Sequence, residues 1–127
     1  MSRKNKRLRE KGISHEKYME LVYFCLQYRE KREQLQSLSF IKSIDYGGVA
    51  GSGGGKPTEK QAIHREELKR DIELIERTVL ESAPEIYSAL LKNVTEGVTY
   101  IYLDVPCSKK YFYAKRREFF IRLALKK

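Results

Sequence analysis

The sequence contains no long hydrophobic run. A stretch of about eighteen consecutive apolar residues, which a membrane-spanning helix needs, occurs nowhere in the chain. The basic N-terminus is not followed by the apolar segment of a secretory signal. Cysteine is scarce too: Cys25 and Cys107 lie far apart and show no pairing pattern, which is typical of free thiols in a reducing compartment. We therefore expect a cytoplasmic protein that does not contact a membrane.

The sequence also lacks the groups of residues on which enzymes depend. It shows no paired-carboxylate motif, no nucleophile beside a base and no cluster of metal ligands. Its two histidines, His15 and His64, stand apart from other ligand-type residues, and neither lies near Cys107 along the chain. We expect no catalytic activity, no cofactor and no metal site.

Glycine is concentrated in one segment. Six of the eight glycines fall within residues 45–57, which should end the preceding helix. Gly55 and Lys56 suggest a phosphate-binding loop, but that motif needs glycine where Ala50 stands and Ser or Thr where Pro57 stands. The segment is therefore predicted to be a flexible linker, which lets one helix fold back on the next or reach a neighbouring chain.

Positive charge lies at the two ends of the chain. The net charge is +9, with six Lys or Arg against one Glu in residues 1–12 and eight against two acids in residues 98–127. Residues 13–97 have twelve basic and fourteen acidic side chains. This distribution is typical of a protein whose ends contact phosphate groups and whose middle packs or oligomerises. The alternative is a basic surface without a partner.

The N-terminal part is predicted to be a basic arm followed by one long helix. Residues 1–12 have Leu8 as their one large apolar side chain, so we expect a disordered arm. It would follow a phosphate backbone or lie in a minor groove, or it serves only as a solubilising tail. Ser14 is a helix cap, and the apolar spacing after it predicts a single helix over residues 13–44. A helix of this length with two faces needs a partner helix, in the same chain or in another subunit.

Two further helices are predicted in residues 58–97. The first begins at the cap Thr58 and ends near Ser82. The second begins at Pro84, with Ser82 as its cap, and ends at Gly97. The long N-terminal helix and the first of these helices should form an antiparallel hairpin that serves as a scaffold or oligomerisation arm.

Residues 98–127 form the region that we expect to contact nucleic acid. The run 98–103 is rich in β-formers, but no second strand is available to pair with it, so we expect a short helix capped by Thr99. Pro106 then interrupts the chain, and Ser108 caps a helix that reaches residue 125.

The helix after Ser108 is predicted to have one buried face. At about 100° per residue, that face comprises Phe112, Arg116, Phe119, Phe120 and Leu123. Arg116 is the one charged member, and it should snorkel, stack on an aromatic ring or reach an acid. The remaining sides are free for a polyanion, or they form an ordinary charged helix face.

The residues expected to contact DNA lie on those remaining sides: Ser108, Lys109, Lys110, Tyr111, Ala114, Lys115, Arg117 and Arg122. Lys110 or Arg117 would read guanine, and the small Ala114 would allow close approach to a groove. The other basic residues, with Lys126 and Lys127, would neutralise phosphates.

One ordered set of residues stands out in the C-terminal third: Gly97-Val98-Thr99-Tyr100, a short apolar segment, and Ser108-x-x-Tyr111-Phe112-Tyr113-x-x-Arg116-Arg117. This order resembles the sigma-factor region-4-like helix-turn-helix, and it is similar in particular to small phage transcriptional activators of the RinA and ArpU type. The resemblance implies DNA binding by the helix after Ser108, a contact with RNA polymerase and control of phage or mobile-element genes. The four residues between Leu103 and Ser108 make a shorter connection than in that family.

We therefore predict an all-α protein with an N-terminal long helical hairpin and a C-terminal helix-turn-helix domain. Its predicted function is that of a sequence-specific regulator that binds double-stranded DNA and forms a homo-oligomer through its N-terminal helices. Two alternatives stay open. One is a phage DNA-packaging adaptor similar to a small terminase subunit, and the other is a helical RNA-binding protein whose tyrosines stack on single strands.

Overall fold

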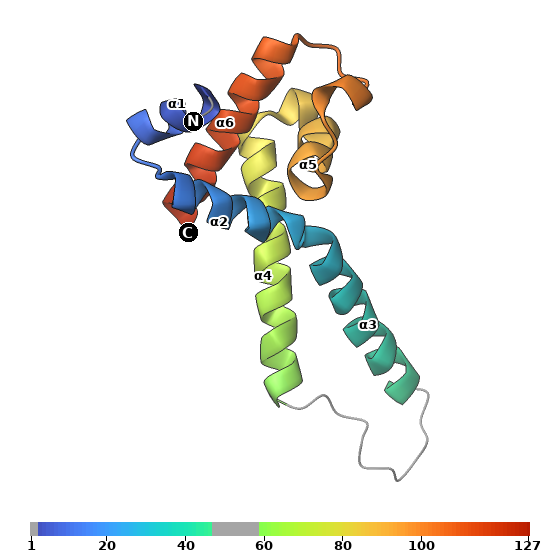
Figure 1. Cartoon of the computed structure of the whole chain (residues 1–127). Helices are drawn as coiled ribbons and strands as arrows, with labels where there is room; N and C mark the ends of the chain where they lie inside the picture. Colours follow the sequence, from blue (N-terminus) through green and yellow to red (C-terminus); the bar gives the residue numbers. More distant parts are fainter. Residues whose placement is uncertain (1–2, 47–58) are drawn as a thin grey trace.

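Most of the described chain is helical. The computed structural model describes residues 3–46 and 59–127, with the side chains of residues 7–38 and 59–127 (Figure 1). These residues contain no strand, and their helices in chain order are α1 (Arg3–Glu10), α2 (His15–Leu26), α3 (Tyr28–Tyr46), α4 (Glu59–Ser82), the 3-10 turn η1 (Pro84–Ile86), α5 (Tyr87–Glu96), the 3-10 turn η2 (Tyr100–Tyr102) and α6 (Lys109–Lys126). The predicted all-α fold class is confirmed.

The basic N-terminal segment is a helix, so the prediction of a disordered arm is wrong for residues 3–10. α1 ends at Glu10 and is followed by a turn in which Gly12 has a left-handed φ of 84°. There the Gly12 N–H donates to the Arg9 carbonyl and the Ile13 N–H donates to the Leu8 carbonyl, each at 3.0 Å. The turn buries both Leu8 and Ile13. The segment folds because Ile13 supplies a second apolar side chain beyond the glycine.

The long helix predicted over residues 13–44 is divided into two. Ser14 caps α2 as predicted, and its side chain accepts a backbone N–H at 3.1 Å. α2 ends at Gln27 (φ −83°, ψ −4°), and α3 then leaves in another direction beside α4 (Figure 1). The break allows α2 to cross the body of the molecule while α3 follows α4, where the Tyr28 hydroxyl donates to Glu76.

α3 and the N-terminal half of α4 extend away from the rest of the molecule and form what we call the α3–α4 extension (Figure 1). The two helices are joined by an ion pair in which Lys31 Nζ lies 2.9 Å from Asp71 Oδ2. Asp45 and Tyr46, predicted to begin the linker, are the last residues of α3. The remainder of the predicted linker and the predicted cap Thr58 lie outside the described residues.

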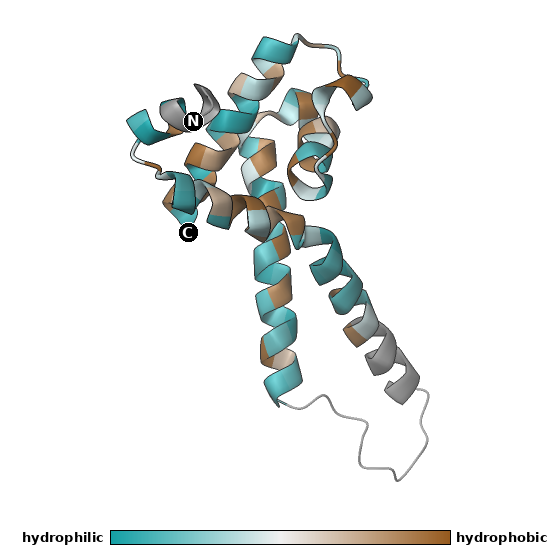
Figure 2. Cartoon of the chain, viewed as in Figure 1, coloured by the Kyte–Doolittle hydropathy of each residue, from teal (hydrophilic) through white to brown (hydrophobic). Residues whose placement is uncertain are grey.

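The hydrophobic core lies where α2, α4, α5 and α6 meet. Figure 2 shows apolar residues at this crossing, whereas the α3–α4 extension is mostly hydrophilic. Burial raises the pKa of the Cys25 thiol to about 12, so this core residue is neutral at physiological pH. The buried side chains of the core are Leu21, Phe24, Cys25, Tyr28, Ile72, Ile75, Val79, Ala83, Ile86, Leu90, Val94, Leu103, Phe112, Phe119, Phe120 and Leu123.

The ends of α4 and α5 meet one prediction and contradict another. Gly97 ends α5 as predicted, with φ 72°, and its N–H donates to the Asn93 carbonyl at 2.9 Å. Ser82 is not a cap, because Ala83 precedes η1 and the Ser82 hydroxyl donates to the Thr78 carbonyl at 2.8 Å. Ser82 thus belongs to the last turn of α4.

We predict that Leu8→Ala unfolds α1 and leaves the rest of the protein folded. Truncation of a buried leucine costs about 2–5 kcal/mol, and a helix of eight residues has too little stability of its own to absorb that loss. Amide hydrogen exchange should show loss of protection in residues 3–10 alone. The exposed Lys11→Ala serves as control, and equal protection of α1 in the two variants would contradict the account.

Candidate nucleic-acid interface

α6 begins at the residue that the sequence indicates. Ser108 has extended backbone angles (φ −72°, ψ 157°), and its Oγ accepts the N–H of Tyr111 at 3.1 Å. The cap satisfies one of the free N–H groups in the first turn, since no earlier carbonyl is available to it. Ser108 is therefore exposed but engaged with its own helix.

The buried face of α6 is the one that its periodicity predicts. It packs against α4 and α2, and four of its side chains are at most 1% exposed: Phe112, Phe119, Phe120 and Leu123. Aromatic contacts fix their arrangement, with the Phe119 and Phe120 ring centres 5.0 Å apart and edge to face. This packing sets the rotation of α6 and so determines which of its residues face solvent.

Arg116 lies on the buried face and is held by uncharged groups. Its Nε donates to Asn93 Oδ1 at 2.8 Å, and its Nη1 donates to the Tyr18 hydroxyl at 2.9 Å. Its guanidinium carbon also lies 4.8 Å from the centre of the Phe120 ring. Arg116 was expected to snorkel, to stack on an aromatic ring or to reach an acid. The structure shows the stacking, and the polar partners are the Asn93 amide and the Tyr18 hydroxyl instead of an acid. Asn93 in turn donates to the Val98 carbonyl at 2.8 Å, so Arg116 links α2, α5 and α6.

Three of the predicted DNA contacts are already engaged with acids. The Tyr111 hydroxyl donates to Glu85, and this bond raises the pKa of Tyr111. Glu118 lies between the two cations Lys115 and Arg122, with its oxygens 3.4 Å from Lys115 Nζ and 3.1 Å from Arg122 Nη2. One carboxylate thus partly neutralises two of the cations that were expected to contact phosphate.

Three other predicted contacts are open. Lys109, Lys110 and Ala114 are exposed, and neither lysine forms an ion pair with any of the described residues. Lys109 and Lys110 lie in the first turn of α6, and Ala114 follows one turn later. The N-terminal half of α6 therefore presents two free cations beside a small side chain.

The last predicted contact, Arg117, lies beside α1. α1 contacts α6 there, and Leu8 and Arg117 line the same small hollow. Burial lowers the pKa of Arg117, and the positive charge of Arg7 lowers it further. No described carboxylate forms an ion pair with Arg117. The two ends of the chain thus bring like charges together.

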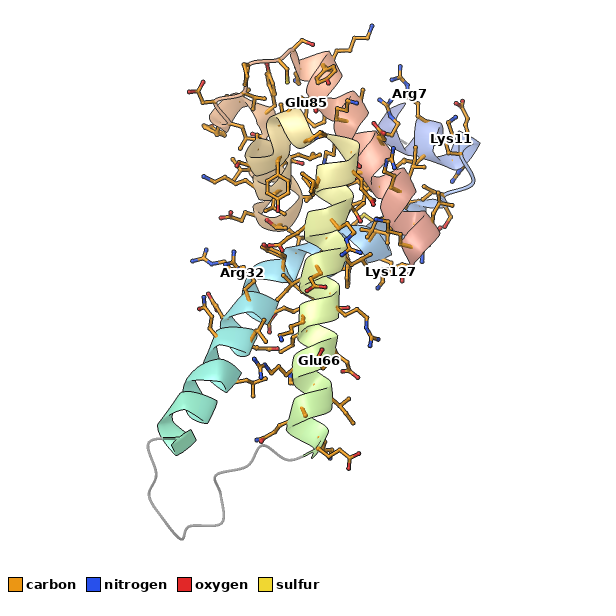
Figure 3. The ribbon with its side chains drawn as sticks, turned by 180° about the vertical axis from the view of Figure 1, so that it is seen from behind. Arg7, Lys11, Arg32, Glu66, Glu85 and Lys127 are labelled. Atoms are coloured by element: carbon orange, nitrogen blue, oxygen red, sulfur yellow. The ribbon has the colours of Figure 1, made fainter. Side chains whose placement is uncertain are left out.

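α1 adds cations that the site prediction did not include. Arg7, Arg9 and Lys11 are exposed, and Figure 3 shows Arg7 and Lys11 on the side of the molecule where α1 lies next to α6. Their charge was visible in the sequence, but their position beside α6 was not. The signal that could have placed them is the pair of apolar residues Leu8 and Ile13 on either side of Gly12.

The C-terminal lysines face the body of the protein. Lys126 donates to Glu81 and, at 3.2 Å, to the Thr78 hydroxyl. Lys127 Nζ lies 3.9 Å from the centre of the Phe24 ring. Both residues help to hold the end of α6 against α4 and α2, which leaves them less available to phosphate than predicted.

The segment before α6 contains a single 3-10 turn in place of the expected short helix. η2 covers Tyr100–Tyr102, and the Thr99 side chain makes no capping hydrogen bond. The α-helix that precedes α6 is α5, and residues 97–108 separate the two helices. A helix-turn-helix over residues 98–127 is therefore not confirmed.

Within residues 3–46 and 59–127, no group of three or more His, Cys, Asp or Glu side chains could hold a metal ion. None of the described helices has the length and apolar character needed to span a bilayer.

Comparison of the chain with protein-family models, with curated proteins and with solved structures finds no match.

Proposed function

We propose that this protein binds double-stranded DNA along a surface formed by α6 and α1, which we call the basic α1–α6 surface. It comprises five exposed cations, the half-buried Arg117 and the small, exposed Ala114 of α6; the exposed cations are Arg7, Arg9, Lys11, Lys109 and Lys110. The observation that supports the proposal is the packing of two basic helices, from opposite ends of the chain, side by side.

Electrostatics favours an anionic partner for this surface. Arg117 is half-buried, and Arg7 brings a second positive charge toward it. Like charges at a partly buried site repel each other more strongly than in water, so their approach costs free energy in the unbound protein. Phosphates placed against Arg7 and Arg117 would relieve that repulsion and release condensed counterions. DNA binding thus turns an unfavourable feature of the fold into a source of affinity.

The dimensions and residues of α6 suit a groove of duplex DNA. Its 18 residues extend for about 27 Å, and a major groove admits one helix. Lys110 can donate to the acceptors of guanine, and Ala114 lets the helix approach closely. Lys109 and the cations of α1 would then contact the backbone phosphates on either side.

A regulatory role is the next step of the proposal. This role is supported by the resemblance of residues 97–120 to phage transcriptional activators. We propose that the protein controls phage or mobile-element genes and that RNA polymerase is its partner. The α3–α4 extension offers a surface away from the basic α1–α6 surface, and we propose it as the site of homo-oligomer formation.

The test is selection of bound sequences from random duplex DNA, repeated at several salt concentrations. We expect a recovered motif and a steep loss of affinity with salt. Lys110→Ala should relax the sequence preference, because it removes the free cation of the groove-facing side. Binding without any sequence preference, weakened uniformly by Lys110→Ala, would contradict sequence reading. A ring of many subunits would favour a packaging adaptor, and preference for RNA would favour an RNA-binding protein.

We further predict that Glu118→Gln strengthens DNA binding. The substitution frees Lys115 and Arg122 from the carboxylate that they share, so two more cations can contact phosphates. Affinity should rise several-fold at low salt, and the salt dependence should become steeper. Glu67→Gln removes the same charge from an exposed position on α4 and is the matched control. Equal affinities of the two variants would show that the Glu118 side of α6 does not face DNA.

A further inference from the structure

η2 presents two large apolar side chains to solvent. Ile101 is 78% exposed and Tyr102 is 82% exposed, although both are large enough to gain from burial. They are neighbours on one turn, which we call the Ile101–Tyr102 wedge. Leu125, 84% exposed near the C-terminal end of α6, is a similarly exposed apolar residue but has no such neighbour at its side. Two neighbouring apolar side chains on one turn form a small exposed apolar patch that is available to a partner.

The turn is fixed on both sides of the wedge. The Tyr100 hydroxyl donates to the Cys107 carbonyl, and the Tyr100 ring centre lies 5.7 Å from that of Phe112. On the other side, Leu103 is buried in the core. The N–H groups of Tyr102 and Leu103 close the 3-10 turn with hydrogen bonds of 3.0 Å. Because Tyr100 and Leu103 point inward and are held, Ile101 and Tyr102 cannot enter the core without unfolding the turn.

The wedge lies at the end of the molecule where α6 begins. The carbonyl of Cys107, which accepts the hydrogen bond from the Tyr100 hydroxyl, directly precedes the cap Ser108. Lys109 and Lys110, which form no ion pair with the described residues, come next in the chain. Figure 1 shows the η2 segment and the start of α6 at the same end of the body. DNA bound by the first turns of α6 would therefore pass close to Ile101 and Tyr102.

The size of the wedge distinguishes between kinds of partner. A stable protein interface takes about 20–30 residues from each side, whereas two side chains suffice for an apolar wedge between stacked bases. The nearby acids are Asp104, which is exposed, and Glu85, which is engaged by Tyr111. The hydrogen bond from the neutral Tyr111 leaves the Glu85 carboxylate charged, so two lysines and two acids lie around the wedge. Lys109 and Lys110 form no ion pair with any described residue, so they remain available to hold a polyanion beside it.

We propose that Ile101 and Tyr102 insert between base pairs of the duplex that α6 binds and kink it at that step. The proposal rests on the proposed DNA-binding function and adds to it a mode of contact. α6 and α1 supply the attraction to phosphate, and the wedge supplies apolar contacts that only a deformed duplex can accept. Sequences with easily unstacked pyrimidine–purine steps would then be preferred at the position of the wedge.

The test measures affinity and bending together. A short duplex rich in TA steps, with a donor and an acceptor dye at its two ends, is titrated with the full-length protein at constant salt. The double variant Ile101→Ser with Tyr102→Ser is compared with Leu80→Ser, which removes an exposed apolar residue from α4. We expect wild type and Leu80→Ser to bring the DNA ends closer. The double variant should bind about tenfold more weakly and leave the duplex straight.

The possible results separate this inference from the function on which it rests. If wild type binds but does not bend the duplex, or if the double variant bends it equally, the wedge is wrong and DNA binding stands. If the double variant keeps the affinity and the bending of the wild type, Ile101 and Tyr102 do not insert into DNA. The two side chains would then be assigned to contact with a protein partner. If wild type does not bind duplex DNA at all, the proposed function is wrong, and the wedge fails with it.

Discussion

The rotation of α6 about its own axis is the constraint on which the other features depend. Phe112, Phe119 and Phe120 are buried against α2 and α4, and a charged residue lies among them. Arg116 is tolerated there because Asn93 and Tyr18 accept its hydrogen bonds, which offsets the cost of removing a guanidinium from water. Since this arrangement permits one rotation, it decides which cations remain in solvent.

The fixed position of α6 also determines what α1 can do. α1 is short and strongly basic, and it is held to the body mainly through the burial of Leu8 and of Ile13 beyond its C-terminus. Hydrophobic burial thus keeps Arg7 near Arg117 against their mutual repulsion. The same contact joins the charges of the two chain ends into one surface, which is the physical basis of the proposed DNA binding.

Local signals in the sequence predicted the parts of the fold that depend on local interactions. The caps Ser14 and Ser108, the stop at Gly97 and the buried face of α6 follow from spacing and side-chain type. The break between α2 and α3 at Gln27 is not marked by a glycine or a proline. It arises because α2 and α3 pack against different parts of the molecule, which the local sequence does not show. For the site, charge and exposure of the lysines were predictable, but partners distant in sequence, such as Glu85 for Tyr111, were not.

The central claim is that α1 and α6 bind phosphates as one surface, and Arg7→Gln tests it most directly. The measurement is the salt dependence of DNA affinity, compared with Arg29→Gln, which removes an exposed cation from α3. The account predicts that Arg7→Gln alone weakens binding and lowers the salt slope by about one ion, without lowering the unfolding midpoint of the free protein. The same affinity and slope in both variants would contradict it.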